Sequence, residues 1–582
     1  MSTNLPRASA PAVLFALGLA AGACGGGGAP PTAPTSTGEP ASMAAPPPAV
    51  SDRQAFDRAA QEITSDFLRA QVAALSSDEL EGRGPTTRGD VAARAYLAEQ
   101  LQAMGYEPGG ADGSWQQPFD LVGVDAHMPK TWTFKRGARS VALTWWEQFI
   151  AASGVQAERA ELKDAELVFV GYGITAPEYA WDDFKGVDVR GKVLLMLNSD
   201  PDWDPALFAG PSRLYYGRWS YKYESAARQG AAGAIIIHTT PSAGYPFQVV
   251  QTSWTGEQFE LPADGAPTVT VKGWVTESAA AKLVALAGRK LPALVESARS
   301  KDFRPVPLGI TTSLSFTNTV HRAPTANVYG LLRGSDPALR DEAVVVTAHH
   351  DHLGVGKPNA AGDTIYNGAL DNASGCAQVL AIARAFAAMP KRPRRTIQIV
   401  FVAAEEQGLL GSAYYAAHPT FPPGAIAANI NIDGGNIWGK TRDVTYVGKG
   451  KSSLDAIVEE IAREQGREVK PDQFPDRGFF YRSDQFNFAK IGVPALYINS
   501  GTDFVDKPAG WGVERLKAYE SRDYHQPSDE LRDDWTFEGM IDDATIGLWT
   551  AFQVAQRDDL PTWTPGDEFE AARKAALAAR AR

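Results

Sequence analysis

Four continuous apolar runs in the second half of the 582-residue chain constrain its fold most strongly. Each is long enough for a strand but shows no alternation of polar and apolar residues, which is typical of strands covered on both faces. Helical patterns separate them, so we predict an α/β domain with a mixed, mainly parallel central sheet flanked by helices. The expected strands lie at 343–348, 396–404, 426–432 and 493–498, and the expected helices at about 372–388, 409–416, 453–466 and 541–556.

The chain is too long for one ordinary hydrophobic core, because single cores stop growing at roughly 250 to 300 residues. Residues 165–310 differ from the rest, with short apolar runs between clusters of Gly, Pro and Asp, and these predict short strands joined by turns. We expect a smaller β-rich domain here, inserted between a first part of the main domain at 51–164 and a second part at 311–560. Its clearest runs are 191–197, 231–238 and 266–271, with a helix at about 222–229.

Amphipathic patterns predict further helices at both ends of this arrangement. Apolar side chains at spacings of three and four predict a helix over 52–75 and a second at about 90–104. Residues 561–582 form a C-terminal tail, within which 568–582 predict a helix rich in Ala and Arg.

The N-terminus carries the features of a targeting segment. Arg7 precedes an apolar stretch at 12–21, which is too short to span a bilayer stably but suits a secretory signal. Residues 19–24 (LAAGAC) resemble the lipobox of bacterial lipoproteins, in which the cysteine is lipidated. We expect a lipoprotein-type signal peptide at 1–24 with lipidation at Cys24; the alternative is a conventional cleaved signal.

The segment after Cys24 predicts a tether. Residues 25–50 are almost entirely Gly, Pro, Ala, Ser and Thr and cannot bury enough apolar surface to fold, so they predict a disordered linker. The expected location is therefore outside the inner membrane, as a periplasmic or outer-membrane-anchored lipoprotein. Membrane contact is expected only through the lipid.

Charge and cysteine content limit which partners and which cross-links the protein can have. A formal net charge of −12 argues against nucleic acid as a partner, because binding a polyanion needs a basic surface. The chain has two cysteines, so with Cys24 lipidated no disulfide is available. Cys376 lies in an apolar helical pattern and is expected to be a buried core residue.

Imidazole and carboxylate side chains follow directly after three of the predicted strands. Because the carboxyl ends of parallel strands meet at one rim of a sheet, these side chains are expected to converge there. Two loop segments, 367–375 and 523–529, carry more of the same chemistry. Imidazole and carboxylate are ligands that zinc accepts, so this rim predicts a metal site. The residues after the strands are His349 to His352, Glu405 with Glu406, and Asp433.

These residues, in this order, resemble the co-catalytic dizinc exopeptidase family, which includes bacterial leucyl aminopeptidases and glutamate carboxypeptidase. The resemblance covers roughly 70–160 and 320–555 and includes an upstream Leu-Glu-Gly-Arg element at 80–83. It implies two Zn²⁺ ions and a peptide substrate. The matching pieces are His349-x-Asp351, Gly-Ala-x-Asp371, Glu405-Glu406, Asp433 and His525.

The resemblance implies a role for each metal-ligating residue. Asp371 would bridge the two zinc ions, His349 and Asp433 would complete one site, and Glu406 and His525 the other. Taken alone, Glu405-Glu406 is also typical of the solvated first turn of a helix, and Asp433 before two glycines is typical of a turn. The complete ordered set favours the metal site over those interpretations.

The remaining roles concern residues beside the ligands. Glu405 would be the general base that takes a proton from the attacking water and returns it to the leaving amine. Asp351 would accept the imidazole N–H of His349, and Tyr524 would stabilise the oxyanion. The family pattern leaves His350 and His352 outside the ligand set. His352 is expected to pack against the site or to support a ligand, and Asp484 is also expected to have a supporting role.

The inserted segment resembles a protease-associated domain, a module thought to cover or narrow the active site; the alternative is an unrelated β-rich insertion. The expected function is a secreted, lipid-anchored dizinc metallo-exopeptidase that removes N-terminal residues from peptides. The first alternative is a glutamate-type carboxypeptidase, which needs cationic groups such as Arg482 or Arg522 to receive a carboxylate. A glutaminyl cyclase with one zinc and a non-catalytic surface receptor are further alternatives.

Overall fold

The computed structural model describes residues 50–110, 112–204 and 207–580. The predicted signal peptide with its Cys24, and the linker up to residue 49, lie outside the described residues. Within them, no helix is both long and apolar enough to cross a membrane.

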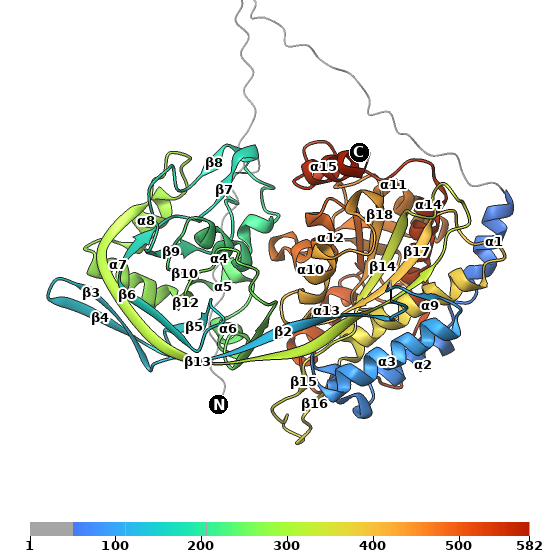
Figure 1. The fold of residues 1–582 in the computed structure, drawn as a ribbon, viewed down its shortest axis with the longest axis horizontal. Helices are drawn as coiled ribbons and strands as arrows, with labels where there is room; N and C mark the ends of the chain where they lie inside the picture. Colours follow the sequence, from blue (N-terminus) through green and yellow to red (C-terminus); the bar gives the residue numbers. More distant parts are fainter. Residues whose placement is uncertain (1–49, 111, 205–206, 581–582) are drawn as a thin grey trace, which may run out of the picture. The chain divides into compact units, whose positions relative to one another are not determined.

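The strands form two assemblies, and the first is a mixed sheet at the centre of the main domain (Figure 1). Its strand order is β1-β13-β17-β14-β18-β21-β19-β20, and the strands from β17 to β21 in this order run parallel, which confirms the predicted mainly parallel sheet. Every residue of β14, β17 and β18 is buried, as the unbroken apolar runs require. The bounds are β1 Glu107–Pro108, β13 Val306–Leu332, β14 Ala343–His349, β17 Thr396–Val402, β18 Ile426–Ile432, β19 Asp443–Tyr446, β20 Glu468–Pro471 and β21 Ala495–Ser500.

Helices cover this sheet and share its core. The segment 52–75, predicted as one helix, forms two, because Thr64 caps α2 by accepting a hydrogen bond from the Phe67 N–H. Helices α9 and α14 place buried apolar faces in the same core cluster as the strands. The bounds are α1 Val50–Ala60, α2 Ser65–Leu75, α3 Arg88–Ala103, α9 Ser374–Ala388, α10 Leu410–Ala417, α11 Asp455–Glu464, α12 Gln485–Lys490, α13 Trp511–Arg522, α14 Glu538–Gln556 and α15 Glu570–Arg580.

A second strand assembly follows the order β4-β3-β13-β6-β9-β10-β12-β5, with β6, β9, β10 and β12 parallel. Helices α4 and α7 come from the same part of the chain and lie beside these strands (Figure 1). The bounds are β3 Thr131–Arg136, β4 Arg139–Thr144, β5 Phe149–Ser153, β6 Arg159–Phe169, β9 Val193–Leu197, β10 Gly233–His238, β12 Val271–Thr276, α4 Trp219–Arg228 and α7 Glu277–Leu286.

At two places in this region the structure differs from the bounds expected from the sequence. The second core begins at Trp132 rather than near 165, because β3 to β6 pair with β12, β13 and β9 and bury their side chains there. The strand expected at 266–271 begins only at Val271; Pro267 lacks the N–H that a ladder position would need.

Strand β13 joins the two assemblies. It runs for 27 residues and pairs first with β3 and β6, then with β2 (Gln116–His127), and finally with β17 and β1. Its residues alternate between buried and exposed as far as Asn318 and are continuously buried from Thr325 to Leu332. The change marks the passage from a sheet with one open face to one covered on both faces.

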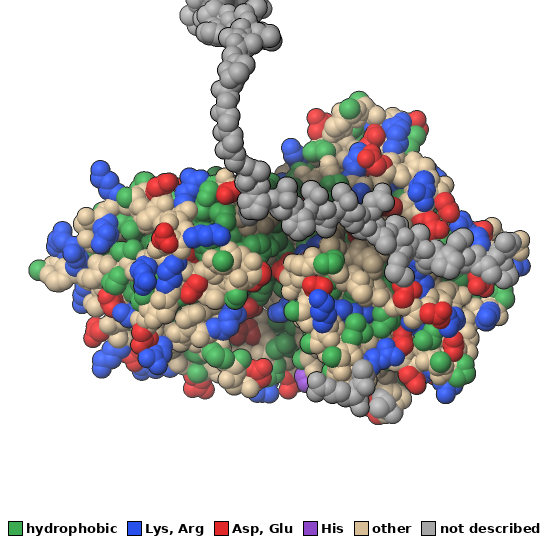
Figure 2. Space-filling view, turned by 90° about the horizontal axis from the view of Figure 1, so that it is seen from above, with side chains coloured by type: hydrophobic (Ala, Val, Ile, Leu, Met, Phe, Trp, Pro, Cys, Tyr) green, Lys and Arg blue, Asp and Glu red, His purple; other side chains and the backbone are tan. Residues whose placement is uncertain are grey.

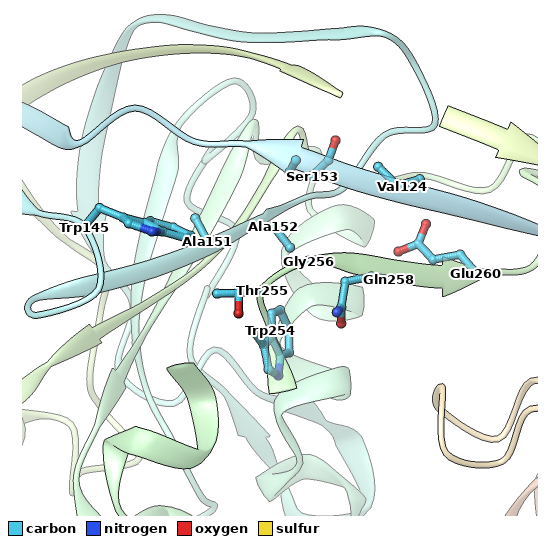
Figure 3. A pocket seen from close by; sticks show the side chains of 11 residues that line it. Val124, Trp145, Ala151, Ala152, Ser153, Trp254, Thr255, Gly256, Gln258 and Glu260 are labelled. Carbon is cyan, nitrogen blue, oxygen red and sulfur yellow. The ribbon is translucent and has the colours of Figure 1, made fainter. Parts of the chain in front are cut away.

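A small cavity of about 20 Å³ lies between β2, β5 and the segment 254–260, with Trp145 and Trp254 among its walls (Figure 3). This volume admits about one water molecule. None of the expected metal ligands lines it.

The charged side chains on the face shown in Figure 2 are of both signs and interspersed. At the end of the chain, the predicted tail helix is α15, and it packs against the main domain. Its Arg573 is buried and donates a hydrogen bond to the Ile426 carbonyl at 2.9 Å, and Arg580 pairs with Glu342 at 2.5 Å.

Candidate metal centre

The carboxyl rim of the parallel strands collects the expected ligands. His349 is the last residue of β14, Glu405 and Glu406 follow β17, and Asp433 follows β18 directly. The other two come from the turn that leads into α9 and from the residues after α13. They are Asp371 and His525.

The first group is built around His349, which is almost fully buried. Its Nε2 lies 3.3 Å from Oδ1 of Asp371 and 3.3 Å from Oδ1 of Asp433. The ligand atoms of the three residues lie within 4.8 Å of one another, close enough to share one cation. The structure therefore brings this predicted set together.

The second group uses the other oxygen of the same aspartate. His525 Nε2 lies 3.3 Å from Asp371 Oδ2 and 3.0 Å from Glu406 Oε2. Asp371 thus turns one oxygen to each group, as a carboxylate that bridges two cations must. All five predicted ligands meet at this rim.

These residues fit a pair of zinc ions by the chemistry of their donor atoms. Imidazole nitrogen and carboxylate oxygen are zinc ligands. The Nε2 atom of His525 is buried and makes no well-directed hydrogen bond, despite its short distances to Glu406 and Asp371. A buried polar atom without a partner is costly unless something else satisfies it, and a cation between these groups would do so.

The charged side chains of the second group also shift each other's pKa values strongly. Against the effect of burial, the charge of Glu406 and the contact with Asp371 raise the pKa of His525 to about 10. Burial likewise opposes ionisation of Glu406, yet His525 and His352 lower the pKa of Glu406 to about 2. Both carboxylate and imidazole are therefore held in place by charge as well as by packing.

His352, which the sequence left outside the ligand set, is in direct contact with it. Its Nδ1 lies 2.7 Å from Glu406 Oε1, and because a carboxylate only accepts, Nδ1 carries the proton. Its Nε2 is buried without a partner, and its ligand atom falls within 4.8 Å of those of Asp371 and Glu406. The ring packs so tightly that a Cβ on Gly368 would lie 2.6 Å from its Cγ.

Asp351 has a different role from the one expected. The Nδ1 of His349 lies 3.2 Å from the carbonyl oxygen of Asp351 and 3.8 Å from its carboxylate. The carboxylate instead accepts hydrogen bonds from the backbone N–H groups of Glu405 at 3.0 Å and Glu406 at 3.4 Å. The carbonyl therefore orients His349, while the side chain fixes the segment that carries the two glutamates. Burial raises the pKa of Asp351.

Two further residues hold the ligands and escaped the sequence analysis. The carboxylate of Asp529 accepts from the Leu370 N–H at 3.0 Å and from the Asp371 N–H at 3.1 Å. The hydroxyl of Ser483 donates to Asp433 Oδ2 at 2.5 Å. No local motif announces either contact, because each joins segments far apart in the chain.

Glu405 and Tyr524 lie beside the ligand groups. Burial, and then the charges of Asp433 and Glu406, raise the pKa of Glu405 well above its usual value. The ring of Tyr524 stacks on that of His525 with 3.8 Å between centroids and remains partly exposed.

Neighbouring polar residues complete the walls of the site. The buried Asp484 accepts from Ser412 Oγ at 2.6 Å, and burial raises its pKa to about 7. His350 points away from the ligands and contacts Asp90 Oδ1 at 3.0 Å. A cavity of about 270 Å³ adjoins the site across Asp529, with three tryptophans in its lining.

Arg83 and Cys376 are buried and hold the structure around the site together. Arg83, from the upstream Leu-Glu-Gly-Arg element, is buried and donates to the carbonyls of His350 at 2.8 Å and Gly368 at 2.9 Å. It therefore ties the strand end to the loop that carries Asp371. Cys376 is buried in α9, as expected for a core residue.

Residues 327–547 match the profile of peptidase family M28. This segment is an M28 peptidase domain. It contains all five predicted ligands together with Glu405, His352, Ser483 and Asp529, whereas the upstream Arg83 lies outside the matched range.

Individual relatives of the M28 domain show more limited similarity. Leupeptin-inactivating enzyme 1 of Streptomyces exfoliatus is 26% identical over 268 residues, which cover 45% of this chain and 55% of that protein. A probable zinc metalloprotease of Pyricularia oryzae is 36% identical over 127 residues, or 22% of each chain. The chain thus spans about half the length of the first relative and about a fifth of the second.

Among solved structures, an aminopeptidase from Aneurinibacillus sp. strain AM-1 aligns with a TM-score of 0.49 and 20% identity. The alignment covers 88% of this chain and 97% of that one.

Proposed function

We propose that this protein is a zinc-dependent aminopeptidase that holds two zinc ions and removes N-terminal residues from peptides. One observation carries the proposal: within an M28 domain, the two oxygens of Asp371 face two separate groups of imidazole and carboxylate. His349 and Asp433 would hold one ion, and Glu406 and His525 the other.

Zinc at such a site supplies a water nucleophile at neutral pH. The residues around it perform the proton transfers. The Glu405 carboxylate takes a proton from the attacking water and delivers it to the nitrogen of the leaving amine. Its raised pKa suits this role, because the group must hold the proton between the two transfers. The hydroxyl of Tyr524, whose ring stacks on that of His525, would donate to the developing oxyanion.

The N-terminal sequence supports a location for this activity. We propose that the chain is exported and anchored through a lipid on Cys24, on the strength of its apolar stretch and the LAAGAC sequence at 19–24. Labelling of cells with a fatty-acid analogue should mark the wild-type protein and leave Cys24→Ser unlabelled. Labelling of both proteins, or of neither, would reject the lipid anchor.

A substrate panel tests the proposed activity. The purified full-length chain, reconstituted with zinc, should release the first residue from aminoacyl anilides and from peptides with a free N-terminus, and should stop when a chelator is added. Blocking the amino group by acetylation should remove the activity. Cleavage only of N-blocked peptides with free carboxyl ends would replace this proposal with the carboxypeptidase alternative.

A further inference from the structure

Three polar side chains lie inside the main sheet, on strands that are otherwise apolar. Apart from the ligand His349, the polar residues of β14 and β18 are Thr347, Asn429 and Asn431, and each is 1% exposed or less. Asparagine is depleted in strands, and a buried amide is costly unless its hydrogen bonds are satisfied. The bonds that these side chains make lead toward the metal site.

The register of the sheet places two of them next to the first ligand group. Strands β14 and β18 run parallel, with Thr347 paired to Asn431. His349 follows Thr347 by two residues on β14, and side chains two residues apart on a strand point to the same face. Asp433 likewise follows Asn431 by two residues, directly after β18. Thr347 and Asn431 therefore form the layer of side chains adjacent to the ligands.

Hydrogen bonds join this layer to Asp433. The hydroxyl of Thr347 donates to Asn431 Oδ1 at 2.7 Å, and Asn431 Nδ2 donates to Ser483 Oγ at 2.8 Å. The Ser483 hydroxyl donates in turn to Asp433 Oδ2 at 2.5 Å. A chain of hydrogen bonds thus runs from inside the sheet to a predicted metal ligand.

Groups that can only accept fix the direction of these bonds. The Phe480 carbonyl accepts from Gln485 Nε2 at 2.7 Å, so the other end of that amide, Oε1, accepts from Asn431 Nδ2 at 3.0 Å. Asn431 therefore presents its nitrogen to Gln485 and Ser483, and its oxygen to β14. Because the Ser483 hydroxyl already receives a proton from Asn431, its own proton is left for the carboxylate of Asp433.

Thr347 stabilises Asn431 in this orientation. Its hydroxyl accepts from Asn429 Nδ2 at 3.0 Å, so its single proton goes to Asn431 Oδ1. Loss of that donor would leave Asn431 Oδ1 buried without a partner and would weaken the preference of the amide for this orientation.

The chain occupies one oxygen of Asp433 and leaves the other for a cation. Oδ2 accepts the Ser483 proton, while Oδ1 lies 3.3 Å from His349 Nε2, within the first ligand group. We propose that Thr347 and Asn431 are positioning residues for the zinc ion of this group. They set the direction of the Ser483 bond and thereby hold Asp433 with Oδ1 toward the ion. This inference rests on the proposed two-zinc site.

A zinc titration of metal-free protein against a competing chelator tests the role of Thr347. Thr347→Val keeps the shape of the side chain but removes the donor, and one of the two ions should bind about 2- to 10-fold more weakly, the range of one neutral hydrogen bond. Thr347→Ser, which restores the hydroxyl, should restore the affinity. Wild-type affinity in Thr347→Val would overturn the inference.

Thr396→Val is the matched control. Thr396 is equally buried, and its hydroxyl also accepts and donates, from the Gly334 N–H at 3.0 Å and to the Arg340 carbonyl at 2.6 Å. It is the first residue of β17, at the opposite end of the strand from the two glutamates. Both valine variants should lower the melting temperature of metal-free protein, and only Thr347→Val should lose zinc affinity. Equal losses of affinity would assign the effect to a weakened sheet and overturn the inference.

A double-mutant cycle shows whether Thr347 acts through Ser483. Ser483→Ala should weaken zinc binding more than Thr347→Val does, because it removes a bond to a charged group. Added to Ser483→Ala, Thr347→Val should cause no further loss, since the path to Asp433 is already broken. The same should hold for Asn431→Ala. Additive losses in both cycles would overturn the positioning role.

These outcomes separate the inference from the function on which it rests. If the wild-type protein binds two zinc ions and cleaves peptides while Thr347→Val binds zinc equally well, the positioning role alone is wrong. If the wild type binds zinc but releases no residue from any peptide, the aminopeptidase proposal fails and the titration still decides the positioning role. A wild-type protein that binds no zinc would overturn both.

Discussion

His352 gives the sharpest test of how the second ligand group is organised. Its Nδ1–H donates to Glu406 Oε1 at 2.7 Å, which leaves Oε2 of the same carboxylate beside His525. We expect this bond to hold Glu406 in the orientation that binds a cation. His352→Ala removes the bond and leaves the carboxylate free to rotate.

The expected magnitude follows from the nature of the bond. A hydrogen bond to a charged group contributes about 1.5–3 kcal/mol, and each 1.4 kcal/mol is about tenfold in affinity. His352→Ala should therefore weaken binding of one zinc ion by roughly 10- to 100-fold, the usual range for residues that support a metal ligand. The other ion, beside His349 and Asp433, should be affected less.

The assay is a zinc titration of metal-free protein against a competing chelator, with thermal unfolding measured in parallel. The matched control is His350→Ala, because His350 is equally buried and contacts a carboxylate, Asp90 Oδ1, at 3.0 Å but away from the ligands. Both variants should lose stability, and only His352→Ala should lose zinc affinity. Equal zinc affinity in His352→Ala and wild type, or equal losses in the two variants, would refute the reasoning.

Three further predictions address other parts of the molecule. Glu405→Gln should keep its zinc while turnover falls by about 10²- to 10⁴-fold, and parallel loss of metal and activity would make Glu405 a ligand instead of the base. In the second strand assembly, burial raises the pKa of Asp183 from 3.8 to about 7. The folded state therefore binds this proton more tightly, and the stability of wild type relative to Asp183→Asn should fall as pH rises from 4 to 7; a pH-independent difference in melting temperature would contradict this. Arg573→Ala should cost about 1–3 kcal/mol in unfolding free energy because it leaves buried carbonyls unsatisfied, whereas the exposed neighbour Lys574→Ala should change it by less than about 0.5 kcal/mol.

The parts of the fold that the sequence predicted are those governed by local pattern. The runs that became β14, β17, β18 and β21 were recognisable because strands covered on both faces must be apolar throughout. Long-range pairing was not recognisable. Strand β13 crosses both assemblies, and its pairing with β3 and β6 draws residues from 131 onward into the second core.

Three of the predicted ligands, His349, Glu406 and Asp433, were predictable because they end or follow strands. Asp371 and His525 lie in the segments before α9 and after α13, and only the fixed order of the whole set pointed to them.

Contacts made across the rim were not predictable, since they depend on how loops from distant segments turn. Asp529 and Ser483 became visible only when the backbone placed them against Asp371 and Asp433. Asp351 shows the same limit, because its carbonyl, not its carboxylate, lies nearer the imidazole ring of His349.

The most direct test of the account is the number of zinc ions held per chain. Elemental analysis of the active, full-length protein should find two, and Asp371→Ala should lose at least one of them, because each oxygen of that carboxylate faces a different ligand group. Full activity with a single zinc ion, or an Asp371→Ala protein that retains both ions, would contradict it.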